Sequence, residues 1–213
     1  MTADTGFITE NHKGNIQAKR IFDVAVSATA LLVLSPIFLI VALLIRFDSK
    51  GAIFFSQNRI GKQGKEFRFW KFRSMYADAE QRKAALMKNN EMECGILFKM
   101  KNDPRITRVG RILRKYSIDE LPQLWNVFIG DMSLVGPRPP LPTEVAKYTP
   151  YQRLRLEVTP GITCIWQVSG RSEIPFPQQV QMDLEYIKKQ SFWYDMTLLF
   201  QTVPAVFKGH GAY

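Results

Sequence analysis

Histidine and cysteine are scarce in this 213-residue chain, which has two of each. His12 and His210 lie near the chain ends, so a Ser-His-Asp or Cys-His mechanism would need an unusual excursion of a terminal segment. Cys94 and Cys164 lie far apart without a C-x-x-C pair, which excludes a disulfide framework and a zinc site. The sequence also lacks G-x-x-x-x-G-K-[ST] and G-x-G-x-x-G, the P-loop and Rossmann signatures. Carboxylates, lysines and arginines must therefore carry any catalysis.

Acidic residues are also too few to balance the basic ones. The chain has 29 Lys and Arg against 19 Asp and Glu, a formal net charge of +10 and a pI near 9.7. Such a surface favours anionic partners, namely nucleic acid, a phospholipid surface or a phosphorylated substrate. The length suits one ordinary domain with an appendage.

An uncharged run, residues 24–45, is the longest apolar stretch and meets the roughly 20 residues needed to cross a bilayer. It is too long for a signal-peptide core and lacks a cleavage site of small residues, so we expect it to be retained. Ser35 and Pro36 fall in its middle, where proline removes one helical hydrogen bond. We expect a kink there, with the Ser35 hydroxyl satisfying a freed carbonyl.

Basic residues flank this run on both sides. By the positive-inside rule, both ends then belong in the cytoplasm. A helix that breaks at Pro36 and returns satisfies this condition, whereas a straight span exports one basic cluster. We therefore favour a re-entrant hairpin over a span, and a buried helix of a soluble core comes third. The flanking residues are Lys19 and Arg20 before the run, and Arg46, Lys50, Arg59 and Lys62 after it.

Beyond residue 50 the pattern predicts a β-hairpin from residues 52–56 and 67–73, joined by a glycine turn. Its alternating aromatic and basic residues also fit a stacking platform for single-stranded nucleic acid, which we consider the weaker interpretation. The charged segment 78–93 is compatible with a surface helix whose role the sequence does not reveal.

Helices are predicted in four later segments. Asp103 and Pro104 form a typical N-cap and N1 pair before a helix with one basic face, which suits an anionic membrane surface or simply a solvated face. Segments 144–157 and 177–190 are predicted helices on either side of an irregular stretch, 158–171. The last segment, 192–207, is apolar almost all round and is expected at the bilayer interface or against the hairpin.

Adjacent carboxylates at Asp119 and Glu120 mark the stretch 116–139 as the candidate catalytic region. Pro122 is tolerated only in the first turn of a helix, which favours Asp119 as the N-cap. There the carboxylate would share the helix terminus with a phosphate. The alternative is a purely structural capping box formed by Ser117 and Glu120.

These residues fall within a set of ordered motifs from Lys19 to the end of the chain, and the chain resembles the bacterial sugar transferase family. Members are monotopic polyprenyl-phosphate phosphoglycosyl transferases, and Cys164 departs from their pattern, where glycine is expected. The motifs are Lys19-Arg20-x-x-Asp23, Ser35-Pro36, Gln57-x-Arg59-x-Gly61-x-x-Gly64, Lys71-Phe-Arg-Ser-Met75, Arg114-x-x-Ser117-x-Asp119-Glu120-Leu-Pro-Gln123, Gly130-Asp-Met-Ser-Leu-Val-Gly-Pro-Arg-Pro139, Pro160-Gly-Ile-Thr163 and Trp166-Gln-Val-x-Gly-Arg171.

The resemblance implies an α+β fold in its minimal catalytic form. A mobile tail, residues 1–18, precedes a re-entrant membrane helix hairpin, residues 19–49, broken at Ser35 and Pro36. Residues 50–213 form a mostly helical cytoplasmic catalytic domain with a small β-hairpin and interfacial amphipathic helices. The protein is expected on the bacterial inner membrane with this domain facing the cytoplasm.

The resemblance also implies a chemistry. Asp119 attacks a UDP-sugar, releases UMP and holds the phosphosugar covalently until undecaprenyl phosphate takes it. Glu120 holds Mg²⁺, Arg114 binds the substrate phosphate, and Pro137, Arg138 and Pro139 contact the nucleotide. The product would begin exopolysaccharide, O-antigen or related glycan assembly. Inner-membrane lipid is an expected partner, nucleic acid is not, and a homodimer is a candidate assembly.

Two alternatives remain at this stage. A non-catalytic, membrane-tethered basic module that binds nucleic acid or anionic lipid explains the charge and the apolar run, but not the paired carboxylates. Direct one-step transfer, with Asp119 as a general base, also fits the sequence. The sequence does not identify the sugar, which is a hexose or an N-acetylhexosamine.

Overall fold

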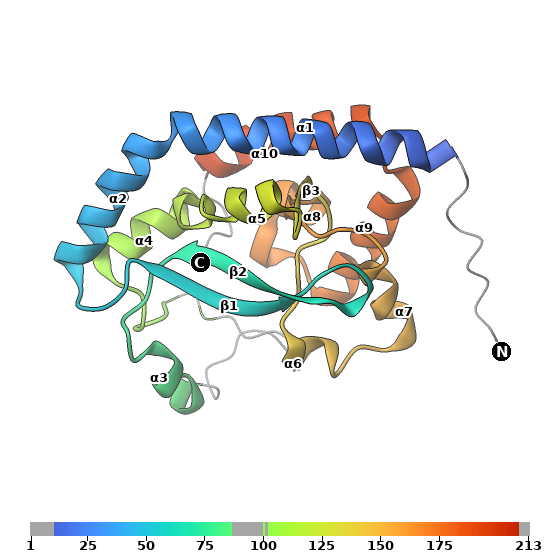
Figure 1. Ribbon diagram of the computed structural model, residues 1–213. Coiled ribbons are helices and arrows are strands. Elements are labelled where there is room, and N and C mark those ends of the chain that lie inside the picture. The colour runs from blue at the N-terminus through green and yellow to red at the C-terminus, as the bar shows by residue number, and fades with distance from the viewer. Residues whose placement is uncertain (1–10, 87–99, 101, 209–213) are drawn as a thin grey trace.

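The computed structural model describes residues 11–86, 100 and 102–208 as a mixed arrangement of helices and short strands (Figure 1). Helices α1 and α10 run along one side, and the strands and shorter helices lie beneath them. This architecture agrees with the α+β prediction. The helices and strands are α1 (Asn11–Val33), α2 (Ser35–Asp48), β1 (Phe54–Ile60), η1 (Lys62–Gly64), β2 (Glu66–Phe72), α3 (Ala79–Leu86), α4 (Arg108–Lys115), η3 (Ile118–Glu120), α5 (Gln123–Ile129), β3 (Ser133–Val135), α6 (Pro142–Val145), α7 (Pro150–Arg153), η4 (Leu154–Leu156), β4 (Gly161–Thr163), α8 (Ile165–Ser169), η5 (Arg171–Glu173), α9 (Phe176–Lys189) and α10 (Phe192–Lys208).

The apolar run forms two helices that meet at an angle of 59°. Pro36 cannot donate to the carbonyl of Leu32, and the Ser35 hydroxyl donates to that carbonyl instead, at 2.8 Å. The predicted kink and its side-chain compensation are therefore confirmed. Within the described residues, no single helix is long and apolar enough to cross a bilayer. The bent pair, Gln17–Val33 with Ser35–Asp48, has the length and hydropathy of a membrane segment when its two helices are taken together.

Two predicted segments extend beyond the described residues. Of the expected mobile tail, residues 1–10 lie outside them, whereas residues 11–18 form the first turns of α1. The helix therefore begins eight residues before the predicted boundary at Lys19, and the mobility of the tail stays a prediction. Of the charged segment 78–93, Ala79–Leu86 is helical as expected, and residues 87–93 lie outside the described part.

Arg20 fastens α1 to the C-terminal end of α5. Its guanidinium donates to the carbonyls of Val127, at 2.6 Å, and Phe128, at 2.8 Å. Both carbonyls lie in the last turn of α5, which ends at Gly130 with φ 100°, and that of Val127 also accepts from Gly130 N–H at 3.2 Å. A cation at this position also suits the negative end of the helix dipole.

Lys19 joins α1 to α10 and β3. Its ammonium group is 2.5 Å from Asp195 and donates to the carbonyl of Val135 at 3.0 Å. The hydroxyl of Tyr186 donates to the same carbonyl and to Asp195. Asp23, one turn along α1, accepts from a backbone N–H of β3. Lys19, Arg20 and Asp23 thus attach the bent helix pair to the rest of the fold.

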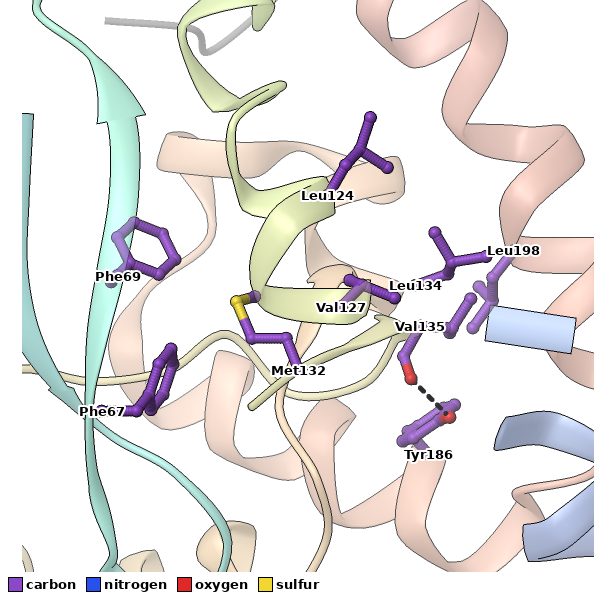
Figure 2. Close-up of a cluster of buried hydrophobic side chains, with 9 residues drawn as sticks. All are labelled: Phe67, Phe69, Leu124, Val127, Met132, Leu134, Val135, Tyr186 and Leu198. Carbon is purple, nitrogen blue, oxygen red and sulfur yellow. Dashed lines mark hydrogen bonds between the residues drawn. The ribbon is translucent and has the colours of Figure 1, made fainter. Parts of the chain in front are cut away.

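The predicted β-hairpin is confirmed, although β1 runs to Ile60, beyond the predicted residue 56. The two strands are antiparallel and pair Phe54 with Phe72 and Ile60 with Glu66 at their ends. Phe69 and Phe72 are each only 1% exposed, and Phe69 packs in the central core. The hypothesis of a nucleic-acid stacking platform is therefore wrong, because rings that fill the core cannot stack on bases. Figure 2 shows this core, whose buried members are Phe67, Phe69, Leu124, Val127, Met132, Leu134, Val135, Tyr186 and Leu198.

Strand β4 lies in the segment expected to be irregular, residues 158–171, and pairs in parallel with β3. A Cβ atom on Gly161 would lie 2.0 Å from the backbone nitrogen of Gly136. The two backbone segments therefore approach more closely than a residue with a side chain would allow. Helix α8 follows within the same stretch, Ile165–Ser169. The prediction failed because each strand has only three residues, too few for a visible alternation.

Two helix predictions need correction. Helix α4 is capped by Thr107, which accepts from Gly110 N–H at 2.9 Å, whereas Asp103 binds Arg105. The predicted helix over residues 144–157 is divided among α6, α7 and η4, because Pro150 restarts the chain after Thr149. The predictions of α9 and α10 are confirmed.

Candidate active site

A cavity of about 530 Å³ lies among η3, β2, α9 and the C-terminal half of α10. It brings together five residues predicted as site residues, whereas Pro137 lines a smaller neighbouring pocket. Ser35 and Pro36 lie elsewhere, at the break between α1 and α2. The five are Arg114, Asp119, Glu120, Arg138 and Pro139.

A tight turn carries the two carboxylates. Ser117 adopts a left-handed conformation, φ 55°, which ends α4 and starts η3. Asp119 lies within η3, and Pro122 caps α5, so the prediction of Asp119 as an N-cap is wrong. The capping box is not formed either, since the side chain of Glu120 bonds to Lys71 and Arg138. A non-glycine residue in this conformation stores about 1 to 3 kcal/mol of strain, which is common beside functional groups.

Asn126 sets the distance between η3 and β2. Its side-chain amide donates to the carbonyl of Arg68 at 2.7 Å and accepts from Trp70 N–H at 3.1 Å, as a neighbouring strand would. Asn126 itself is fully buried. Helix α5 is therefore docked against the edge of β2, and the next strand residue, Lys71, is brought to Glu120.

Glu120 is held by two cations. Its Oε1 accepts from Lys71 Nζ and from Arg138 Nη2, each at 2.7 Å. Burial alone would raise the pKa of Glu120, but Arg138 and Lys71 together lower it below its usual range. Glu120 is therefore ionised, and the pKa of Arg138 is raised in return. Burial lowers the pKa of Lys71 despite both acidic neighbours.

Asp119 is buried but less tightly paired than Glu120. Only 5% of the residue is exposed, and its Oδ2 lies 3.8 Å from Lys71 Nζ, too far for a hydrogen bond. Burial raises the pKa of Asp119; Lys71 offsets part of this effect, and the adjacent Glu120 adds to it. The pair thus combines a tightly bound carboxylate with a loosely paired one, and the second can react with a substrate.

Further cations surround the pair. Arg59 donates to the carbonyl of Pro139 at 3.0 Å and lies over the ring of Phe69, and burial together with Arg138 lowers its pKa to about 10. Arg171 lines the cavity in a left-handed conformation, φ 53°. The positions of these groups suit a polyanionic ligand, because arginine forks bind phosphate oxygens in pairs.

Arg155 lines the cavity from a buried network. It forms an ion pair with Asp183 and donates to the hydroxyl of Tyr148 at 3.1 Å. Burial raises the pKa of Asp183 to about 6, although Arg155 opposes the shift. Sequence reasoning missed this network, since its members come from η4, α6–α7 and α9 without a local motif.

Lys71, Arg59 and Arg171 were visible in the sequence as parts of motifs but received no role. Their roles depend on which segments the fold brings to Asp119, and strand or turn patterns do not carry that information. A basic residue inside a core strand, such as Lys71 between buried aromatic positions, is the one local signal that could have been read.

The donor atoms around Glu120 bear on whether this site suits Mg²⁺. No group of three or more histidine, cysteine or acidic side chains suited to a metal occurs in the described part of the chain. Mg²⁺ commonly uses one or two carboxylates together with substrate phosphates. Glu120 meets this requirement, because both short hydrogen bonds fall on Oε1 and its Oε2 has only a 3.5 Å contact to Arg138. Oε2 is therefore the less occupied of the two Glu120 oxygens.

Comparison with known proteins shows similarity along most of the chain. Residues 14–209 match the family model described as bacterial sugar transferase. The chain is 47% identical over 196 residues to galactosyl transferase CpsE of Streptococcus agalactiae, covering 92% of this chain and 43% of that protein. It is 38% identical over 220 residues to the exopolysaccharide production protein ExoY of Sinorhizobium fredii, covering 100% and 97%.

A third relative is undecaprenyl-phosphate galactose phosphotransferase of Salmonella typhimurium, 42% identical over 198 residues, 92% of this chain and 41% of that protein. The chain thus spans about two fifths of the length of two of these relatives and nearly all of ExoY. A family match over residues 14–209 covers most of its length. The chain therefore belongs to the bacterial sugar transferase family.

Proposed function

We propose that this protein moves a phosphosugar from a UDP-sugar to undecaprenyl phosphate and releases UMP. The observation that carries the proposal is a buried, loosely paired carboxylate, Asp119, in a cavity lined by arginines and a lysine. The Salmonella relative is named for the same lipid acceptor. Products of this kind begin the assembly of exopolysaccharide, O-antigen and related glycans.

The reaction consists of two displacements at one phosphorus atom. An oxygen of Asp119 attacks the β-phosphate, the bond to the bridging oxygen breaks, and UMP leaves with that electron pair. A phosphate oxygen of undecaprenyl phosphate then attacks the same phosphorus and releases the Asp119 carboxylate. Covalent catalysis of this type divides one difficult transfer into two easier ones.

The cations have separate roles in this proposal. Lys71 and Arg138 neutralise Glu120 and remain near the transferring phosphate, where negative charge accumulates. Arg114 lines the same cavity and binds phosphate oxygens. The loop of Pro137, Arg138 and Pro139 contacts the nucleotide, and Arg59 fixes that loop by its hydrogen bond to Pro139.

Mg²⁺ supplies charge neutralisation to the diphosphate when it is bound. Glu120 would hold it through Oε2, and Lys71 and Arg138 orient Glu120 for this task by their bonds to Oε1. Asp119 keeps its own oxygens for the attack on phosphorus.

The exposed apolar side chains support attachment to the bacterial inner membrane. They concentrate on α1, α2 and α10, and α1 and α10 lie side by side (Figure 1). We propose that the bent pair α1–α2 enters one leaflet and returns, with the catalytic domain in the cytoplasm. The exposed residues are Ile21, Leu32 and Val33 of α1; Ile37, Leu39, Ile40, Leu43, Leu44 and Phe47 of α2; and Trp193, Phe200, Val203 and Phe207 of α10.

A re-entrant hairpin predicts that both of its ends are cytoplasmic. Cysteines introduced at Asn11 or Lys62, after replacement of Cys94 and Cys164 by serine, should react with an impermeant reagent only in permeabilised cells. Labelling of Asn11→Cys but not Lys62→Cys in intact cells would mean that the chain spans the membrane. Pro36→Ala should straighten the break and shift labelling toward that spanning pattern.

The function is tested by UMP release across a panel of UDP-hexoses and UDP-N-acetylhexosamines, with undecaprenyl phosphate and Mg²⁺. At least one donor should give UMP together with a lipid-linked phosphosugar. The competing hypothesis of a non-catalytic basic module predicts no UMP from any donor and salt-sensitive binding whatever residue occupies position 119.

A further inference from the structure

The cavity has one apolar wall that the donor chemistry does not explain. Thr202, Ala205 and Val206 of α10 line it and, at their i, i+3 and i+4 spacing, share one face of the helix. All three are partly exposed, whereas Asp119, which lines the same cavity, is buried. This wall therefore lies at the more accessible side of the cavity.

The same turn of α10 also carries exposed apolar side chains. Val203 is 55% exposed and Phe207 74%, although each is a sequence neighbour of a cavity-lining residue. The face of α10 that lines the cavity therefore adjoins the apolar surface that we assign to the membrane.

The apolar wall continues toward the carboxylates. Ile162 of β4 lines the cavity together with Leu121 and Leu124, and Leu121 directly follows Glu120 in the chain. The hydroxyl of Thr202 donates to the carbonyl of Leu198 at 2.7 Å and lies 2.8 Å from Thr163 Oγ1, so it is already hydrogen-bonded within the protein. Apolar contact with this wall therefore leaves no hydroxyl unpaired.

We propose that this wall is the portal for the lipid acceptor, an inference that rests on the function proposed above. The isoprene units next to the phosphate lie against Thr202, Ala205 and Val206, and the phosphate reaches the cations beside Asp119. Of the two substrates, only the acceptor combines an apolar chain with a phosphate. A UDP-sugar is polar along its whole length and gains little from such a wall.

Bulky substitutions on the cavity side of α10 test the portal. Ala205→Trp and Val206→Phe should raise the KM for undecaprenyl phosphate about tenfold or more, because added volume on a packed wall displaces the chain. The KM for the UDP-sugar, and the release of UMP without acceptor, should stay close to the wild-type values. Val203→Trp adds similar bulk on the exposed side of the same turn and should leave both KM values near wild type.

A second measurement uses the unmodified protein. A polyprenyl phosphate with a photoreactive group on its first isoprene unit should label Thr202, Ala205 or Val206, and excess undecaprenyl phosphate should suppress the labelling. Labelling confined to the exposed positions Phe200, Val203 and Phe207, without competition, would contradict the portal.

The outcomes separate the two proposals. If wild-type protein turns over but Ala205→Trp and Val206→Phe change neither KM, or both equally, the portal is wrong and the function stands. If wild-type protein releases UMP from no donor and makes no lipid product, the proposed function is wrong, and the portal proposal, which depends on it, is wrong as well.

Discussion

Asp119→Asn should abolish the covalent phosphosugar adduct and lower turnover by about 10³-fold or more, because an amide is a poor nucleophile of nearly the same size. The side chain is buried and lies 3.8 Å from Lys71, too far for a hydrogen bond that the amide would break. Folding and membrane association should therefore persist. With UDP-sugar and Mg²⁺ but no acceptor, wild-type enzyme should release a stoichiometric burst of UMP and gain the mass of one phosphosugar.

Intact-protein mass spectrometry on rapidly quenched samples measures the adduct directly. Asp131→Asn is the matched control, since Asp131 is not among the cavity-lining residues and accepts from the Asn126 amide at 3.3 Å. It should keep the burst and the adduct. Absence of both from wild-type enzyme that nevertheless turns over with acceptor would exclude the two-step mechanism and make Asp119 a base in direct transfer.

The burst should also depend on pH in a defined direction. Only the ionised carboxylate attacks phosphorus, and burial raises the pKa of Asp119 above its ordinary value of 3.8. The burst rate should therefore fall as pH drops through this raised pKa, at a higher pH than for an exposed aspartate. Glu120 does not contribute to this fall, because its pKa is lowered.

Much of the site was predictable from local sequence, since the motif around Asp119 and Glu120 lies in one continuous stretch. The break at Pro36 was predictable for the same reason, because both the lost hydrogen bond and its replacement by Ser35 are local. Short-range steric rules and charge patterns decide such features.

Features that depend on tertiary contacts were not predictable. The N-cap assignment failed because Ser117, in a left-handed conformation, starts a separate turn before α5. The role of Lys71 depends on Asn126, which docks α5 against β2 across more than 50 residues of sequence. The parallel pair β3–β4 depends on the close approach of Gly136 and Gly161. None of these contacts leaves a periodic pattern in the chain.

Glu120→Gln should leave the fold intact but remove most activity, about 10² to 10³-fold, and raise the Mg²⁺ concentration required for half-maximal rate. The amide retains one oxygen for Lys71 or Arg138 but lacks the charge that binds the ion and pairs with both cations. Lys71, released from Glu120, would then be free to pair with Asp119, now 3.8 Å away, and weaken it as a nucleophile.

Mg²⁺ titrations of UMP release compare this variant with Glu144→Gln. Glu144 also lines the cavity and is 9% exposed, but its carboxylate accepts from Leu141 N–H at 2.8 Å, a bond that the glutamine oxygen can keep. Its Mg²⁺ midpoint should match the wild type, whereas that of Glu120→Gln should increase. An unchanged midpoint in Glu120→Gln, with activity lost, would assign Glu120 to the orientation of Lys71 and Arg138 instead of the metal.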